Sequence, residues 1–173
     1  MKRNDLHALT LTAMMIPVIA VAAQLALPIA SVPMTLQTFA VCFAGLMLGP
    51  MRGVAAVAVY LLMGAIGIPV FAGFTGSLAA VVGPTGGFLV GFLPLVLLAG
   101  LAKNKGAVRT AMLLASGLLL CHLAGVLWFA HTAGVSILSA SLITSLPYLL
   151  KDALSSLFAY LLAKRLAKHR KWP

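Results

Sequence analysis

The chain has 173 residues, of which 62% are hydrophobic and 8% are charged, and its formal net charge is +10. Soluble domains carry about 25% charged residues, and a chain this short cannot hide so much apolar surface from water. Its basic residues stand in short clusters between apolar runs, without interleaved aromatic residues, which argues against a nucleic-acid-binding face. The composition therefore predicts a membrane protein, with the lipid bilayer as the solvent for most side chains.

Six apolar segments are candidates for membrane-spanning helices, each of which needs about 20 residues. They are residues 9–27, 36–48, 54–70, 88–102, 111–129 and 147–163. The second segment is short and would use flanking residues. The first follows Lys2 and Arg3 like a signal peptide, but because five more spans come after it, we interpret it as an uncleaved helix. We predict one all-α membrane domain, residues 1–173, with six transmembrane helices.

Basic residues indicate the orientation of these helices. With six spans, eleven of them fall on one side of the membrane, and the connections on the other side, residues 28–35, 72–87 and 130–145, contain no Lys or Arg. The positive-inside rule then places both termini in the cytoplasm and predicts a multi-pass protein of the cell (cytoplasmic or inner) membrane. The eleven residues are Lys2, Arg3, Arg52, Lys103, Lys105, Arg109, Lys164, Arg165, Lys168, Arg170 and Lys171.

One basic residue does not fit this pattern. Lys151 lies next to Asp152, about one helical turn after Pro147, near the outer end of the last span. An ionised residue in a span is costly and usually faces a cavity, a partner or a substrate path. Alternatively, Lys151 reaches the outer headgroups while Asp152 stabilises the helix N-terminus. Asp152 shares a helical stripe with Tyr148 and Ser155, which favours Asp152 as the inward-facing residue.

Two further groups of candidate residues lie on the predicted outer side. Thr35 and Gln37 can both donate and accept hydrogen bonds at the mouth of the second span, although Thr35 is also a natural helix cap. The loop 69–87 contains Phe71 and Phe74 among glycines. A connection this long is often functional, so it is either a lid over a ligand or a plain connection.

Few residues of this chain could carry catalysis. Its only acids are Asp5 and Asp152, and neither a Ser-His-Asp set nor paired carboxylates are recognisable. His122 is interpreted as a hydrogen-bonded interior residue without a role, and the four histidines show no metal-ligand spacing. Cys42 and Cys121 lie in apolar runs and are interpreted as small buried hydrophobes. We therefore predict no enzyme activity, no metal and no cofactor.

Several motifs at compatible spacings cover nearly the whole chain. They are VPMTLQTFA at 32–40, LGPMRG at 48–53, YLLMGAIGIPVFAG at 60–73, GPTGGF at 83–88, GVLW at 125–128, and the Pro147-Tyr148 start of the last span with Asp152 after it. Together these motifs resemble the BioY family, the biotin-specific S components of energy-coupling factor (ECF) transporters.

The resemblance implies a six-helix bundle that binds biotin near the outer face. In the family, the aspartate at the Asp152 position and a lysine three residues later contribute to the pocket, but here Ser155 stands at the second position. Asp152 is then expected to accept a ureido N–H, and Lys151 to pair with the carboxylate tail. Thr35 and Gln37 are expected to bond the ureido oxygen or the tail. Aromatic side chains are expected to cover the apolar bicycle: Phe71, Phe74 and Tyr148.

The resemblance also implies partners, because the chain has no ATP-binding motif. They would be a transmembrane coupling subunit and ABC-type ATPases. Two other functions remain open on the residues. One is an S component for a different small vitamin. The other is a proton-coupled carrier or intramembrane enzyme that uses Asp152, for which transport or turnover would need no ATPase.

Overall fold

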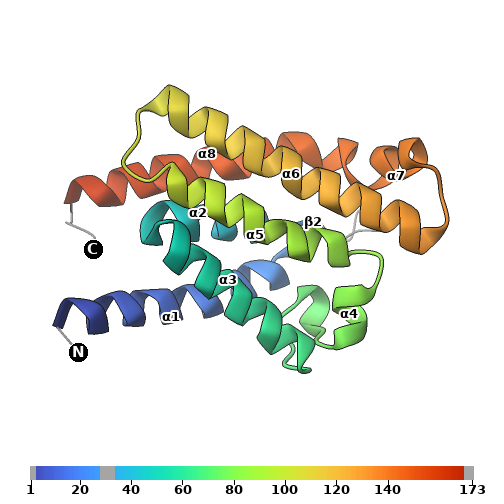
Figure 1. Ribbon diagram of the computed structural model, residues 1–173, viewed down its shortest axis with the longest axis horizontal. Helices are drawn as coiled ribbons and strands as arrows, with labels where there is room; N and C mark the ends of the chain where they lie inside the picture. The colour runs from blue at the N-terminus through green and yellow to red at the C-terminus, as the bar shows by residue number, and fades with distance from the viewer. Residues whose placement is uncertain (1–2, 28–33, 170–173) are drawn as a thin grey trace.

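The computed structural model describes residues 3–27 and 34–169, and almost all of its elements are helical (Figure 1). Lys2, Arg170 and Lys171 of the charge pattern, and Val32 and Pro33 of the first motif, lie outside the described residues. The elements in chain order are α1 (Arg3–Gln24), β1 (Ala26–Leu27), β2 (Met34–Thr35), α2 (Gln37–Leu48), α3 (Pro50–Ala65), η1 (Ala72–Phe74), α4 (Leu78–Val82), α5 (Gly86–Leu101), α6 (Ala107–Ala133), α7 (Ile137–Thr144) and α8 (Leu146–His169).

The helices form a bundle around α2. Every residue of α2 except Phe39 is buried, and α2 packs against α1, α3, α5 and α8. A helix that is apolar on all sides belongs in such a position. The segments Asp5–Gln24, Ala107–Ala133 and Leu146–Lys168 are long and apolar enough to cross a membrane, whereas α2, α3 and α5 are apolar but have only 12, 16 and 16 residues. The prediction of an all-α membrane protein is confirmed at this level.

Small residues allow the inner helices to approach closely. A Cβ atom added to Gly45 of α2 would lie 2.6 Å from the backbone oxygen of Val96 in α5, and one on Gly100 would meet the backbone of Pro50. Gly49 turns the chain from α2 into α3 with a φ of 84°, which only glycine adopts readily. Pro50 follows as the first residue of α3, where its missing N–H is harmless.

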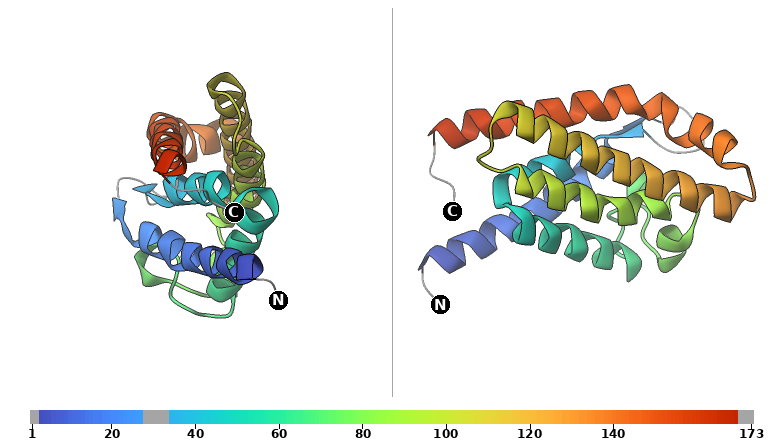
Figure 2. Two further views of the ribbon diagram at one scale, coloured as in Figure 1. Left: turned by 90° about the vertical axis from the view of Figure 1, so that its left-hand side faces the viewer. Right: turned by 45° about the horizontal axis from the view of Figure 1, so that its top comes forward.

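The basic connections gather at one end of the bundle. The start of α1 and the end of α8 lie at the same end as the α2–α3 turn and the α5–α6 connection (Figures 1 and 2). Lys103, Lys105 and Lys164 line one cleft there, and burial and the nearby Arg52 guanidinium lower the pKa of Lys103. At the other end lie α4, α7 and the antiparallel pair β1–β2, which joins Ala26 to Thr35.

Candidate functional site

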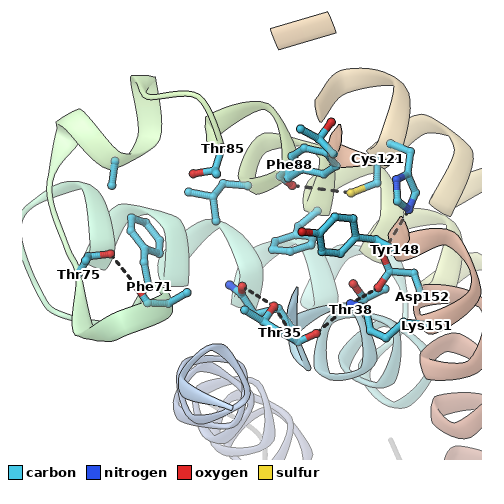
Figure 3. Close-up of a pocket in the computed structure, with 17 residues that line it drawn as sticks. Thr35, Thr38, Phe71, Thr75, Thr85, Phe88, Cys121, Tyr148, Lys151 and Asp152 are labelled. Atoms are coloured by element: carbon cyan, nitrogen blue, oxygen red, sulfur yellow. Dashed lines mark hydrogen bonds and ion pairs between the residues drawn. The ribbon is translucent and has the colours of Figure 1, made fainter. Parts of the chain in front are cut away.

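A cavity of about 140 Å³ lies toward the end of the bundle that carries α4 and α7. Figure 3 shows Asp152, Lys151 and Tyr148 on one side of it and Phe71 and Thr75 on the other. The cavity is lined by Thr35, Gln37, Thr38, Phe71, Ala72, Thr75, Ala80, Thr85, Phe88, Leu89, Phe92, Cys121, His122, Thr144, Tyr148, Lys151 and Asp152. These residues come from β2, α2, the segment between α3 and α5, α5 itself, α6, α7 and α8.

The two oxygens of the Asp152 carboxylate have different surroundings. Asp152 is 7% exposed, and its Oδ2 lies 3.2 Å from Nε2 of His122 on α6. Its Oδ1 is buried and forms an ion pair with the Lys151 ammonium, and the side chains of Lys151 and Thr38 are both hydrogen-bond partners of the carboxylate. A carboxylate oxygen can accept more than one hydrogen bond, so Oδ1 can also accept from a donor that enters the cavity.

Lys151 is held inside the site by a second contact. Its Nζ donates a 2.9 Å hydrogen bond to the backbone oxygen of Thr35, so the ammonium links α8 to the segment that leads into α2. An ammonium has three donors, and a buried charge needs a partner of opposite sign. Thr35 and Asp152 meet those requirements, and the side chain points into the cavity rather than away from it (Figure 3).

His122 lies between Asp152 and Ser145. Its Nε2 faces the carboxylate, and its Nδ1 is 2.9 Å from Oγ of Ser145, which is the C-cap residue of α7. The expectation that no Ser-His-Asp set exists is therefore wrong in geometry, because the fold joins residues 23 and 30 positions away from His122. Ser145 is buried and does not line the cavity, so its hydroxyl is not presented to a ligand there.

Thr35 and Gln37 belong to a chain of hydrogen bonds below the cavity. The Thr35 hydroxyl donates to Oε1 of Gln37 at 2.9 Å, and Nε2 of Gln37 donates to the Tyr60 hydroxyl at 2.7 Å. The Tyr60 hydroxyl in turn donates to the backbone oxygen of Val70 at 3.2 Å. Leu36 is the N-cap residue of α2, but the N–H of Gln37, the first residue of the helix, donates to the Thr35 hydroxyl at 3.3 Å, so Thr35 also contributes to the start of α2. The chain connects α2 and α3 to the loop over the cavity.

Most of the residues predicted from the sequence line this cavity, and two do not. Thr35, Gln37, Phe71, Tyr148, Lys151 and Asp152 are among the lining residues. Ser155 is buried almost one helical turn farther along α8, and Phe74, whose backbone has a positive φ of 54°, is 73% exposed.

Several lining residues were not selected from the sequence, among them Thr38, Thr85, Phe88 and His122. A signal existed for His122, since a titratable side chain inside an apolar span generally marks a functional position. Phe88 holds the His122 ring edge-on, with ring centroids 6.0 Å apart. The others are common residues in loops and helix ends, and no local pattern distinguishes them.

Comparison with known proteins gives consistent matches over the whole chain. The model of the BioY family matches residues 1–172. The Probable biotin transporter BioY of Pyrococcus horikoshii is 38% identical over 157 residues, which are 91% of this chain and 94% of the relative. The Biotin transporter BioY of Thermotoga maritima is 38% identical over 158 residues, 87% of this chain and 89% of the relative.

A solved structure shares the fold. It is the crystal structure of the S-component for biotin from an ECF-type ABC transporter. The two structures superpose with a TM-score of 0.88 at 27% sequence identity, and the match covers 97% of this chain and 95% of that one.

Proposed function

This chain belongs to the BioY family, and from this premise we propose that it binds biotin in the cavity beside Asp152 and acts as the substrate-binding S component of an ECF-type importer. Its named relatives are biotin transporters, and its structural neighbour is the biotin S component of an ECF-type transporter. The cavity supports this function independently, because it combines apolar walls with a few polar groups, as small-molecule sites do.

The observation that carries the proposal is the ion pair of Asp152 and Lys151. The ureido group of biotin presents an N–H donor next to a carbonyl acceptor. Asp152 Oδ1 can accept a further hydrogen bond, and the Lys151 ammonium beside it offers a donor. A neighbouring acceptor and donor on the protein match a neighbouring donor and acceptor on the ligand. We therefore assign the ureido group to this pair.

This assignment changes the role expected for Lys151. The sequence-based expectation placed the ureido group at Asp152 and the carboxylate tail at Lys151. These groups are at opposite ends of biotin, whereas the two side chains are in contact. The tail therefore extends toward the loop side of the cavity, where the hydroxyls of Thr75 and Thr85 lie (Figure 3). The bicycle packs against the aromatic rings of Tyr148 and Phe88, and Phe71 covers the ligand from the side of Thr75.

The size of the cavity implies movement on binding. Small-molecule pockets usually enclose about 300–1,000 Å³, and this cavity encloses about 140 Å³. Phe71 is 3% exposed and covers the cavity from the loop after α3. We therefore propose that the loop with Phe71 moves outward to admit biotin and then packs against it.

The arrangement in the membrane is part of the same proposal. Six spans, formed by α1, α2, α3, α5, α6 and α8, would leave both termini and the basic connections in the cytoplasm. The cavity would then open to the outside, where a capture subunit of the cytoplasmic membrane meets its substrate. A transmembrane coupling subunit and ABC-type ATPases would supply the energy, since the chain carries no ATP-binding motif.

Binding of radiolabelled biotin to the detergent-purified protein, without ATP or other subunits, tests this function. We expect saturable binding that unlabelled biotin displaces. Folded protein that fails to bind biotin but binds another vitamin would assign it to a different S component. Biotin uptake in proteoliposomes that contain this chain alone, driven by a proton gradient, would favour a proton-coupled carrier instead.

A further inference from the structure

The row Ser145–His122–Asp152 joins three helices inside the bundle. Ser145 ends α7 and precedes α8, His122 lies in α6 and Asp152 in α8. All three side chains are buried, with exposed fractions of 8%, 5% and 7%. Burial removes polar groups from water, so each of them needs a partner inside the protein. The row provides these partners, and one end of it is the carboxylate of the proposed biotin site.

The chemistry of the row fixes the direction of each hydrogen bond. An ionised carboxylate only accepts, so Nε2 of His122 is the atom that carries the proton and donates to Asp152 Oδ2. In the neutral ring, Nδ1 is then the acceptor, and it receives the hydroxyl proton of Ser145 at 2.9 Å. Asp152 thus selects the tautomer, and the Ser145 hydroxyl, which can donate or accept, provides the partner that Nδ1 of this tautomer needs.

The backbone holds Ser145 in place for this task. Its N–H donates to Ser141 at the end of α7, and its carbonyl accepts from the N–H groups of Tyr148 and Leu149 at the start of α8. On the other side of the row, the edge-on ring of Phe88 limits rotation of the imidazole. His122 is therefore fixed in position and in tautomer before any ligand arrives.

We propose that His122 is a positioning residue for ligand recognition, which engages Oδ2 of Asp152 so that Oδ1 faces the cavity and accepts a ureido N–H. This inference rests on the proposed biotin site and adds to it a residue and a cause of selectivity. Without the imidazole, the carboxylate is free to rotate and place both oxygens against Lys151. The protein would then lose its preference for ligands that bring an N–H to this point.

The test compares biotin with analogues methylated on one or the other ureido nitrogen, because methylation removes the N–H and keeps the rest of the ligand. We expect the wild type to prefer biotin over one of these analogues by about tenfold or more, the value of a hydrogen bond to a charged group. His122→Leu should lower biotin affinity by about tenfold and bring the preference close to one. His122→Gln, whose amide N–H can reach the same oxygen, should retain most of it.

Two further variants complete the experiment. Ser145→Ala should reduce the preference by a smaller factor, because Nδ1 of His122 loses its partner and the ring is held less firmly against Asp152. His131→Leu is the matched control, since His131 is an exposed histidine on the same helix, and it should behave as the wild type. If His122→Leu does not fold, the Ser145→Ala and His122→Gln proteins carry the same comparison.

The outcomes separate this inference from the function itself. Equal losses for biotin and for both methylated analogues in His122→Leu would mean that the imidazole only packs, which overturns the inference. An unchanged preference in both the His122→Leu and Ser145→Ala proteins would overturn it as well. A wild type that binds biotin without any such preference would refute the ureido contact and leave biotin capture standing. A wild type that does not bind biotin would refute the proposed function, and the inference with it.

Discussion

The side chain of Gln24, at the end of α1, is hydrogen-bonded to the backbone of Phe74, which lies 50 residues later in the chain. Its Oε1 accepts a 2.8 Å hydrogen bond from the N–H of Phe74, while its Nε2 donates to the carbonyl of Phe71 at 3.0 Å. One carboxamide thus provides hydrogen-bond partners for backbone groups at both ends of the short turn that contains η1. Because Phe71 covers the cavity, this contact links the first helix to access to the site.

Gln24→Leu should loosen this loop. The substitution removes both hydrogen bonds and leaves the loop backbone to bond with water, at a cost of about 1 kcal/mol. We expect bound biotin to dissociate about fivefold faster, measured by chasing radiolabelled biotin with excess unlabelled ligand. Thr10→Val is the matched control on α1, since it removes only the hydrogen bond of an exposed hydroxyl to Leu6. A wild-type dissociation rate in Gln24→Leu would show that the contact does not restrain the loop.

Asp152→Asn should weaken biotin binding. The change keeps the shape of the side chain but removes the charge, so a ureido N–H loses about 1.5–3 kcal/mol of hydrogen bonding, which is about ten- to a hundredfold in affinity. Asp5→Asn, which neutralises the other acid of the chain, is the control and should leave the affinity unchanged. Equilibrium binding of radiolabelled biotin measures both variants. Wild-type affinity in Asp152→Asn would place the ligand elsewhere.

Lys151→Met should weaken the binding of biotin and of biotin amide by similar factors. The reason is that the ammonium donates to the ureido oxygen, which both ligands share, and compensates the charge of Asp152. We expect a loss of about tenfold or more for each ligand, measured by competition against radiolabelled biotin. Lys105→Met, at the opposite end of the bundle, is the control. A much larger loss for the acid than for the amide would instead assign the carboxylate tail to Lys151.

Tyr60→Phe should lower the thermal stability of the protein in detergent. Tyr60 is fully buried, and its hydroxyl accepts from Gln37 and donates to the carbonyl of Val70. Removing it leaves two buried groups short of a partner, at a cost of about 1–3 kcal/mol. Tyr160→Phe, in a half-buried ring on α8, is the control and should melt like the wild type. Equal melting temperatures for all three proteins would mean that this chain of hydrogen bonds contributes no stability.

Reporter fusions test the proposed topology. A reporter inserted at Lys105, in the α5–α6 connection, should be cytoplasmic, whereas one at Gly76, in the loop between α3 and α4, should be outside. The basis is the segregation of basic residues to one end of the bundle. If both reporters lie in the same compartment, the count of six spans is wrong.

Much of the site could be predicted from Asp152 and Lys151 alone. Charge is so costly in a bilayer that an ionised pair in an apolar span indicates a site without any knowledge of the fold. Thr35, Gln37 and Phe71 were candidates from their residue types and their positions on the outer side, and the family resemblance, now confirmed, added the ligand. Because these signals are local or shared by relatives, they can be read from one sequence.

The remainder depends on contacts between distant segments. The positions of His122, Ser145 and Gln24 relative to their partners are set by how α1, α6 and α8 pack, and no spacing along the chain encodes it. The same holds for the direction of the Lys151 side chain. A lysine near the end of a span can reach the headgroups or the interior, and the choice here depends on the carbonyl of Thr35.

The short, buried α2 has a consequence for how the protein is made. Twelve helical residues extend about 18 Å, and the hydrocarbon core measures about 30 Å, so α2 by itself would draw its polar ends into lipid. Its neighbours include α8, which comes later in the chain than the other helices that pack against α2. The central helix therefore reaches its final surroundings only after α8 has been synthesised. A chain truncated before α8 would expose the α8-facing side of α2 and would be a target for the proteases that remove unassembled membrane proteins.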